Sequence, residues 1–280
     1  MKTQLKINWI KERWSLDDIE KIYEFNNKAV YSAKSIKWGN VIIKINENKD
    51  ELASEYNMLK ELDGEGSCRV FVYDSEYGIL IEERIIPGTE LRKEQRAESR
   101  ISHFIEVFQS IHKEIDNENS FETYLDWLIR ADRFCIENNI EEVLRENMHK
   151  ALIIGQEMFN KYSERVLLHG DLHHDNILKN DNGDYFMIDP KGIIGPAIFD
   201  IPRYILNEID FVSEDERKRH IRHIIDLISE KIKYPVSDII KLFFMEVILA
   251  NVWNVEDGIK PNMNQVLMAV EVVKKEYRSR

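Results

Sequence analysis

The sequence is poor in cysteine and contains no long hydrophobic run. Its 280 residues include only two cysteines, Cys68 and Cys135, far apart in the chain, so we expect no disulfide framework and a reducing compartment. No apolar run approaches the roughly 18 residues that a membrane helix requires. The basic N-terminal stretch also lacks the continuous apolar segment of a secretory signal. We therefore expect a cytoplasmic protein without a membrane-bound part.

Basic residues are fewer than acidic ones. Lysine and arginine together number 39 against 51 aspartates and glutamates, which gives a net charge of −12. Such a chain repels a phosphate backbone on average, so we expect no nucleic-acid partner. An acidic cleft concentrates cations, so a small cationic ligand fits this charge. Whether the protein is a monomer or a homodimer stays open.

The first part of the chain predicts a mixture of strands and one helix. Residues 41–45 form a β-branched run, and residues 69–73 and 78–82 have the composition of two further strands. Between them, apolar residues recur at helical spacing over residues 50–62. Pro87 and Gly88 then end this pattern.

The rest of the chain predicts helices and one β-hairpin. Residues 176–179 and 185–189 flank the turn-forming sequence NDNGD, which should close the hairpin. We predict an α+β protein of two lobes, with a β-rich lobe over residues 1–83 and a mainly helical lobe over residues 84–280. Ligands most often bind in the cleft between two such lobes. Helical periodicity is found over residues 104–111, 124–131, 141–162, 198–207, 214–231, 236–257 and 264–278.

Residues 167–178, LLHGDLHHDNIL, concentrate three histidines and two aspartates within seven positions. A zinc site is one interpretation, because His169 and His173 have the i, i+4 spacing of helical zinc ligands. However, no glutamate follows His169, and we can name no third ligand elsewhere. A zinc hydrolase is therefore the weaker interpretation, and we expect His169 to hydrogen-bond the loop backbone.

The same segment matches a kinase catalytic loop better. The pattern H-R-D-L-x-x-x-N has its His, Asp, Leu and Asn in register here, with glycine in place of arginine. Asp171 would then orient and deprotonate an attacking hydroxyl group. Asn176, together with Asp189 at the end of the hairpin, would supply the oxygen ligands that Mg²⁺ prefers. The segment therefore predicts Mg²⁺-dependent phosphoryl transfer.

A kinase of this type also needs an upstream lysine for the nucleotide phosphates, paired with a glutamate of the next helix. Lys44 lies in the predicted strand over residues 41–45, and Glu55 follows eleven residues later in the predicted helix. Glu51, one turn earlier, stays open as the alternative partner. These residues predict a kinase-type fold that uses ATP as the phosphoryl donor.

Two segments of the sequence, the loop above and the stretch after the hairpin, resemble a known family. HGDLHHDNIL, followed by MIDPKGIIGPAIFDIPRYI, resembles the aminoglycoside phosphotransferases, small-molecule kinases with a protein-kinase-like bilobal fold. The sequence DPKG, with the later GPA at residues 195–197 and Asp200, is most similar to the streptomycin 6-phosphotransferase and hydroxyurea phosphotransferase branch.

The resemblance implies further roles for single residues. The adenine of ATP should contact the backbone of the connector between the lobes, here residues 82–85, so Glu82 and Arg84 are candidate cofactor-binding residues. Asp200 should open a helix and anchor the catalytic loop. Arg203 is implied to be a structural partner rather than a catalytic group.

The nucleotide loop departs from the family pattern. We place the first β-turn around residues 32–35, where no G-x-G-x-x-G stands. Ser32 or Ser35 is therefore the candidate for the nucleotide contact, with Ser35 as our choice, and GTP stays open as an alternative donor. The sequence after Asp189 lacks an A-P-E segment, which argues against a protein kinase.

For the acceptor site, the sequence predicts a group of candidate residues rather than defined roles. The resemblance implies substrate-binding acids in the helical lobe, because aminoglycosides are polycations. The candidates are Glu208, Asp210, Glu246, Glu256 and Asp257, of which we expect one or two in the cleft. Glu246 stands in an apolar stretch, where a carboxylate needs a partner. Lys191 would contact phosphate or substrate, or would only shape the metal loop, and we leave these roles open.

The leading hypothesis is ATP-dependent O-phosphorylation of a small, cationic, aminoglycoside-like (streptomycin-type) substrate, as in antibiotic resistance. A metabolic kinase for sugars or amino alcohols stays open, and so does a pseudokinase that only binds nucleotide. The complete set of Lys44, Asp171, Asn176 and Asp189 speaks against the pseudokinase, since a protein that only binds nucleotide has no need of Asp171.

Overall fold

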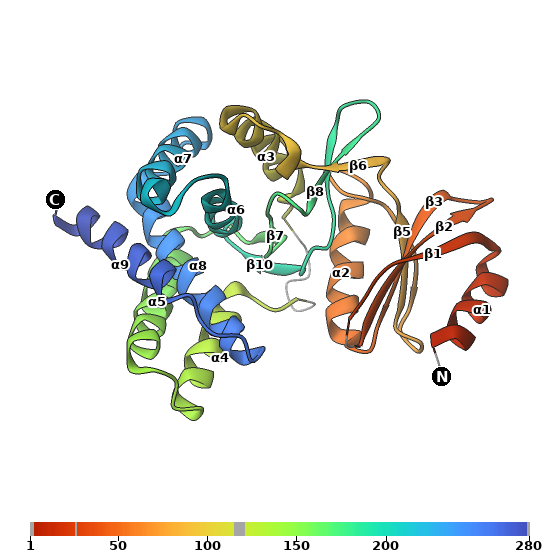
Figure 1. The fold of residues 1–280 in the computed structure, drawn as a ribbon, viewed down its shortest axis with the longest axis horizontal. Helices are drawn as coiled ribbons and strands as arrows, with labels where there is room; N and C mark the ends of the chain where they lie inside the picture. Colours follow the sequence, from red (N-terminus) through yellow and green to blue (C-terminus); the bar gives the residue numbers. More distant parts are fainter. Residues whose placement is uncertain (1–2, 26, 115–120, 279–280) are drawn as a thin grey trace.

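The computed structural model describes residues 3–25, 27–114 and 121–278. The chain forms two lobes, with a β-sheet at one end of the molecule and a group of helices at the other (Figure 1). The first lobe contains α1 (Thr3–Trp14), β1 (Leu16–Phe25), β2 (Lys28–Ser35), β3 (Gly39–Asn46), α2 (Lys49–Leu62), β4 (Val70–Asp74) and β5 (Ile79–Glu83).

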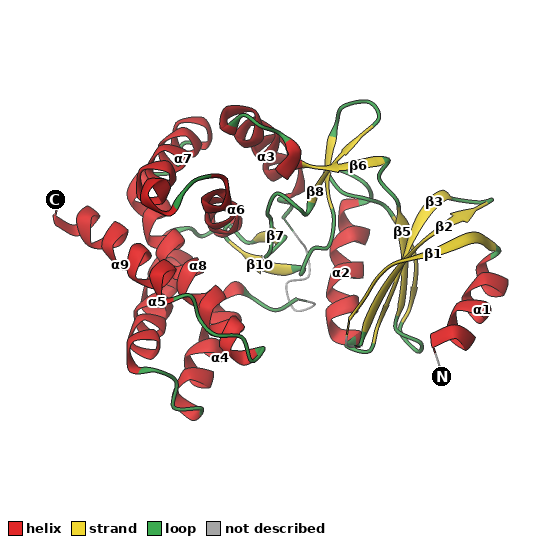
Figure 2. Ribbon diagram, in the orientation of Figure 1, coloured by secondary structure: helices red, strands yellow, loops and turns green. Residues whose placement is uncertain are grey.

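The five strands of the first lobe form one antiparallel sheet in the order β1-β2-β3-β5-β4. Helix α1 covers its outer face, and α2 lies between the sheet and the helical lobe (Figures 1 and 2). Successive side chains of β3 point to opposite faces of the sheet, so one set packs against α1 and the other set faces α2. Val41 and Ile43 are buried with Ile10 of α1, so Lys44 faces α2.

The caps and the buried face of helix α2 agree with its sequence pattern and with its position between the sheet and the helical lobe. Asn48 caps its N-terminus by accepting a hydrogen bond from the Glu51 amide, and Asp63 ends it in the left-handed conformation. The apolar stripe predicted over residues 50–62 is buried and belongs to the same hydrophobic cluster as the helical lobe. The predicted strands and this helix are confirmed, with shifts of one or two residues at their ends.

The helical lobe is built around α8 (Val236–Glu256), which packs against most of its other helices. None of the described helices is long and apolar enough to cross a membrane. The further elements are β6 (Pro87–Glu90), α3 (Ala97–Ile111), α4 (Tyr124–Glu137), α5 (Glu142–Lys161), β7 (Val166–Leu168), β8 (Ile177–Asn180), β9 (Tyr185–Met187), β10 (Ile193–Gly195), α6 (Ile201–Glu208), α7 (Arg217–Ile232) and α9 (Met263–Arg278), with short 3₁₀ turns between them.

Two small sheets lie where the lobes meet. Strands β8 and β9 form the predicted hairpin, and β6 pairs with β8 as a third strand. Strands β7 and β10 form an antiparallel pair. The loop of residues 169–176 therefore runs from β7 to β8, and Asp189 follows β9.

The structure confirms the α+β class and corrects two local predictions. Residues 32–35 are not a turn: they complete strand β2, which begins at Lys28, soon after β1 ends at Phe25. Pro87 and Gly88 do not simply end the β-rich part, because they begin β6. The division between residues 83 and 84 stays our proposal for the boundary of the lobes.

Candidate active site

The loop of residues 169–176 is held by one buried carboxylate. Asp200, at the start of α6, accepts hydrogen bonds from the amides of His169 and Gly170, both at 2.7 Å, and lies 2.9 Å from Nε2 of His112. Gly170 has a φ of +76°, and a Cβ atom there would lie 2.9 Å from the Trp127 ring. A side chain at this position is therefore excluded, which explains the glycine in the motif. The predicted anchoring by Asp200 is confirmed.

The histidines of the loop support its structure. Nδ1 of His169 accepts from the Asp171 amide at 3.1 Å, so Nε2 carries the hydrogen and donates to the Ile188 carbonyl at 2.9 Å. Burial lowers the pKa of His169, which keeps this neutral form. His174 is also buried, with Nε2 2.9 Å from Oε1 of Glu208. Because both ring nitrogens of His169 are engaged, a zinc site on His169 and His173 does not fit.

Asp171 lies at the open end of the loop. Its side chain is 25% exposed, and Oδ1 lies 3.2 Å from Nε of Arg203 and 3.8 Å from Nε2 of His173. Its main-chain carbonyl accepts from Nδ2 of Asn176 at 3.0 Å. The carboxylate is thus directed to the cleft while the backbone behind it is fixed.

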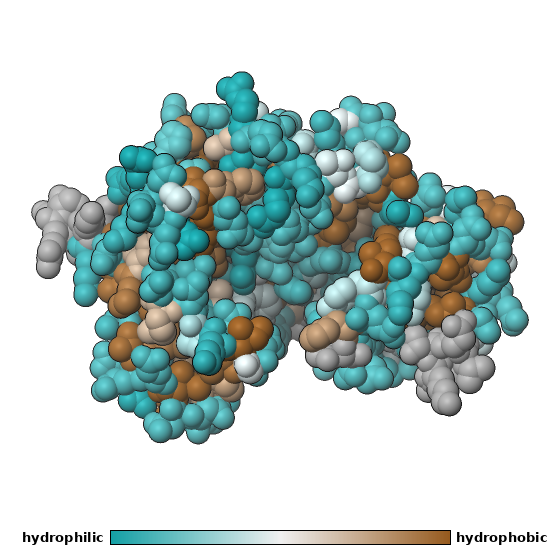
Figure 3. Space-filling view, in the orientation of Figure 1, coloured by the Kyte–Doolittle hydropathy of each residue, from teal (hydrophilic) through white to brown (hydrophobic). Residues whose placement is uncertain are grey.

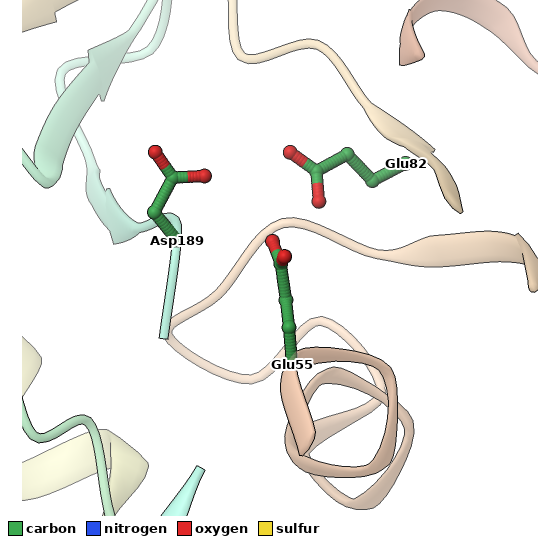
Figure 4. Close-up of side chains that lie close together, drawn as sticks. All are labelled: Glu55, Glu82 and Asp189. Carbon is green, nitrogen blue, oxygen red and sulfur yellow. The ribbon is translucent and has the colours of Figure 1, made fainter. Parts of the chain in front are cut away.

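Lys44 lies among three carboxylates. Its Nζ contacts Glu55 and Asp189 and lies 2.9 Å from Oε1 of Glu82. Figure 4 shows these carboxylates pointing toward one another from α2, β5 and the segment after β9. Burial lowers the pKa of Lys44, but the carboxylates outweigh it and the pKa lies well above its ordinary value. Lys44 is therefore a permanent cation, and the predicted pair with Glu55 is confirmed.

Glu82 differs from its neighbours in this cluster. It is 2% exposed, and its Oε2 atom is buried without a hydrogen-bond partner among the described residues. Burial raises its pKa to about 8, since the attraction of Lys44 is opposed by Glu55 and Asp189. For Asp189, burial would raise the pKa, but Lys44 outweighs it and the pKa lies below its ordinary value.

Asn176 and Asp189 have the chemistry of a magnesium site. The Ile188 amide donates to the Asn176 carbonyl at 2.9 Å, which brings the two residues to adjoining positions. Because Nδ2 of Asn176 is bonded to the loop, its amide oxygen remains for a cation. The Asp189 side chain is 47% exposed. An amide and a carboxylate oxygen fit Mg²⁺.

Two adjoining cavities open beside these residues. The larger, of about 910 Å³, is lined by Asp171, Gly170 and Arg203 and by residues of α2, α4 and α8. The smaller, of about 190 Å³, is lined by Lys44, Glu55 and Asp189 beneath strands β1 to β3. Lys191 and Glu51 line both cavities. The space-filling view shows the mainly hydrophilic notch between the two lobes (Figure 3).

The structure brings together some of the predicted cofactor residues and separates others. The prediction that Ser35 contacts the nucleotide is wrong. Its Oγ accepts from the amides of Lys37 and Trp38 in the β2–β3 turn, and Ser35 lies five residues along β2 from Val30, the pairing partner of Lys44. Glu51 is not the partner of Lys44, because it accepts from Lys28 at 2.7 Å.

The connector also differs from the prediction. Glu82 belongs to strand β5, and its side chain points to Lys44 rather than into a connector. The amides of Glu83 and Arg84 donate to the Arg69 and Asn40 carbonyls, at 2.8 and 3.1 Å, and the Arg84 side chain is exposed. Neither amide is thus available to a nucleotide base in this conformation.

The acceptor candidates also divide. Asp210, Asp257 and Lys191 line the larger cavity, where Asp210 lies 3.3 Å from Arg92 and Lys191 lies 3.7 Å from Glu51. Glu208 is instead fully buried and paired with Arg100. The prediction that Glu246 binds the substrate is wrong. Glu246 is 1% exposed and lies behind Arg203, so it cannot contact a substrate directly. No local pattern predicts the charged residues Asp50, Glu122 and Arg130, which also line this cavity.

Fold and site together define a two-lobed kinase of the type that phosphorylates hydroxyl groups of small molecules. The family model described as "Aminoglycoside/hydroxyurea antibiotic resistance kinase" matches residues 13–258, and the chain belongs to this family. No curated protein matches the sequence.

Solved structures show the same fold at low sequence identity. An aminoglycoside phosphotransferase in a ternary complex with ADP and hygromycin B has a TM-score of 0.70 at 13% identity, covering 97% of each chain. The choline kinase LicA from Streptococcus pneumoniae has a TM-score of 0.64 at 17% identity, covering 97% of this chain and 99% of that one. An ethanolamine kinase of Plasmodium vivax has a TM-score of 0.64 at 13% identity, covering 94% and 84%.

Proposed function

We propose that this protein is a cytoplasmic, Mg²⁺-dependent phosphotransferase that transfers the terminal phosphoryl group of ATP to a hydroxyl of a small cationic acceptor of the aminoglycoside class. The observation that carries the proposal is the position of Asp171. It lines the larger cavity, and the same cavity shares Lys191 and Glu51 with the smaller one beside Lys44. An acceptor and a nucleotide phosphate would therefore meet at this carboxylate.

The residues around the two cavities have different roles in the reaction. Lys44, held by Glu55, binds the phosphates of the nucleotide. Asn176 and Asp189 would hold Mg²⁺, which when bound would neutralise charge on the phosphate oxygens. Asp171 hydrogen-bonds the acceptor hydroxyl and accepts its proton as the hydroxyl oxygen attacks the terminal phosphorus of ATP. The bond from this phosphorus to the bridging oxygen breaks, and ADP leaves. Transfer is then mainly a matter of positioning and charge stabilisation.

The charge of the larger cavity favours a cation as acceptor. Six acidic residues line it against three basic ones, Arg130, Lys191 and Arg203. Such a surface attracts an amine or a guanidinium group. The acidic residues are Asp50, Glu51, Glu122, Asp171, Asp210 and Asp257.

An amino-alcohol acceptor is the second candidate. Trp127 and Trp253 line the cavity and form an edge-to-face pair with ring centroids 5.2 Å apart. Aromatic faces bind ammonium groups, and similar structures include choline and ethanolamine kinases. GTP is the alternative phosphoryl donor, and the assay therefore includes it beside ATP.

A coupled phosphotransfer assay tests the proposal. The purified protein is assayed with Mg²⁺ and either ATP or GTP against streptomycin, other aminoglycosides, hydroxyurea, choline, ethanolamine and a panel of sugars. We expect acceptor-dependent turnover that Asp171→Asn abolishes while nucleotide affinity is retained. Turnover that survives in Asp171→Asn would refute the assignment of Asp171. Tight nucleotide binding without turnover on any acceptor would favour the pseudokinase.

A further inference from the structure

Arg203 lies between the predicted catalytic carboxylate and a second, buried one. It stands in the first turns of α6, and its side chain is 17% exposed. Its Nε atom is 3.2 Å from Oδ1 of Asp171 and 2.8 Å from Oε1 of Glu246. A guanidinium in this position interacts with both charges at once.

Glu246 stands in the apolar helix α8 and is 1% exposed. A carboxylate buried in such surroundings is costly unless it is paired. Its second oxygen accepts a hydrogen bond from the Tyr124 hydroxyl at 2.5 Å, and Tyr124 is itself buried in α4. Tyr124, Glu246 and Arg203 thus form a chain from the core of the lobe to Asp171.

At the outer end of this chain, the Arg203 and Glu246 side chains are close together but not hydrogen-bonded through Nε and Oε1. Among the described residues, neither Nε of Arg203 nor Oε1 of Glu246 has an aligned hydrogen bond, although their separation is that of an ion pair. The guanidinium also borders the larger cavity and lies 5.5 Å from the centre of the Trp253 ring. It therefore touches the space where the acceptor would bind, and catalytic contacts often align only when substrate is present.

We propose that Arg203 is a positioning residue for phosphotransfer: it engages Oδ1 of Asp171 and leaves Oδ2 for the acceptor hydroxyl, while Glu246 and Tyr124 anchor its guanidinium from the core. This inference rests on the proposed function. It explains why a glutamate is kept inside α8. It also explains how an aspartate that follows a glycine in a loop keeps one orientation.

The competing explanation is that Arg203 only ties α6 to α8. That role would change stability, whereas positioning changes turnover at constant nucleotide affinity. Because Arg203 borders a cavity of about 910 Å³, free guanidinium ions can reach the space that its removal would leave. Restoration of turnover by guanidinium therefore separates the two explanations.

The experiment compares Arg203→Ala, Arg203→Lys and Glu246→Gln with the wild type, using the acceptor identified by the assay above. Arg203→Ala should lower kcat about 100-fold, the effect expected from misplacing a reacting group by about 1 Å, with the Kd of the nucleotide unchanged. About 50 mM guanidinium chloride, well below denaturing concentrations, should restore part of this kcat. Arg203→Lys should retain part of it, and Glu246→Gln should lie between Arg203→Ala and the wild type.

The control variant is Arg165→Ala. Arg165 packs over Phe159 and donates to three main-chain carbonyls of the same lobe, away from the cavity. Its loss should lower thermal stability without a kcat that guanidinium restores. A kcat of Arg203→Ala close to the wild-type value would overturn the inference, as would a loss that neither guanidinium nor lysine relieves. Loss of turnover in Asp171→Asn, measured alongside, shows whether the proposed function itself still stands.

Discussion

Two buried glutamates show how their partners decide the state of a carboxyl group. Glu82 faces one lysine shared with two other carboxylates, and its Oε2 has no hydrogen-bond partner among the described residues. Glu208 accepts hydrogen bonds from Arg100, His174, His220 and Tyr204. Burial raises the pKa of both groups, but the donors around Glu208 outweigh it and hold that pKa well below its usual range.

Glu82 should make the protein less stable as the pH rises. Its pKa is about 8 in the folded protein against an ordinary value of 4.5, so the folded state binds the proton more tightly. Stability is then lost as the pH rises from about 4.5 through 8. Thermal unfolding of the wild type and of Glu82→Gln at pH 6 and pH 9 measures this. We expect the Tm to fall less with pH in the variant; equal slopes would show that Glu82 is ionised throughout.

Glu208 should act in the opposite direction. Its folded-state pKa is depressed, so its contribution is complete above the unfolded value of about 4.5 and declines as the pH falls below it. Glu208→Gln should therefore be less stable than the wild type at pH 7, and the difference should shrink toward pH 3. Urea unfolding at several pH values measures it. A difference that does not change with pH would mean that shape rather than charge stabilises this cluster.

At the scale of elements, the loop after β9 comes very close to α2. Gly192 has a φ of +62°, and a Cβ atom there would lie 2.4 Å from the main-chain oxygen of Ser54. Only glycine can thus bring this loop, which carries Asp189, against the helix that carries Glu55. The close approach links the metal loop of one lobe to the lysine partner of the other.

Gly192→Ala should therefore separate the loop from α2. We expect a loss of about 1–3 kcal/mol in stability and weaker nucleotide binding, measured by urea unfolding and by titration with ATP. Gly183→Ala is the control: Gly183 also has a positive φ, +95°, but a Cβ there would meet only Lys179, at 3.9 Å. The control should lose about 1 kcal/mol and bind ATP normally. Equal effects on ATP binding would contradict this account of Gly192.

Sequence patterns predicted the elements that carry their own periodicity. Strand β3 and helix α2 were predicted because β-branched residues and an apolar stripe mark them. Strand β6 was missed, since it begins with Pro87 and Gly88, and β7 has only three residues, too few to show alternation. Pairing with β8 and β10, distant in sequence, is what makes these two segments strands.

The same limit applies to the candidate site. The loop residues Asp171 and Asn176 could be predicted because the motif is local in sequence. Glu246 was identified as a carboxylate in need of a partner, but its partner Arg203 lies on another helix, and only the fold shows that Arg203 separates it from the cavity. Contacts between distant segments follow from tertiary packing, which no local pattern contains.

At the scale of the whole molecule, the net charge of −12 is reflected in the acidic residues that line the larger cavity. The larger cavity has six acidic side chains against three basic ones, whereas the smaller one has three lysines, Lys28, Lys44 and Lys191, against the three carboxylates of Glu51, Glu55 and Asp189. A cationic acceptor is therefore attracted to the larger cavity, while the lysines of the smaller one offer contacts to the phosphates of a nucleotide. Lys191 and Glu51, which line both cavities, stand at the division between them.

This arrangement predicts that the KM of a cationic acceptor depends on salt. The Debye length falls from about 30 Å at 0.01 M to about 8 Å at 0.15 M salt, so the attraction of the acidic wall should be screened and the KM should rise several-fold. Asp257→Asn removes one charge from the cavity wall and should reduce this dependence. Asp181→Asn removes the same charge from the exposed β8–β9 turn and changes the net charge equally, from −12 to −11. Steady-state kinetics of both variants at several salt concentrations then distinguish a local field from the charge of the whole protein. If both variants behave alike, the cavity does not steer the acceptor, and a neutral sugar becomes the better candidate.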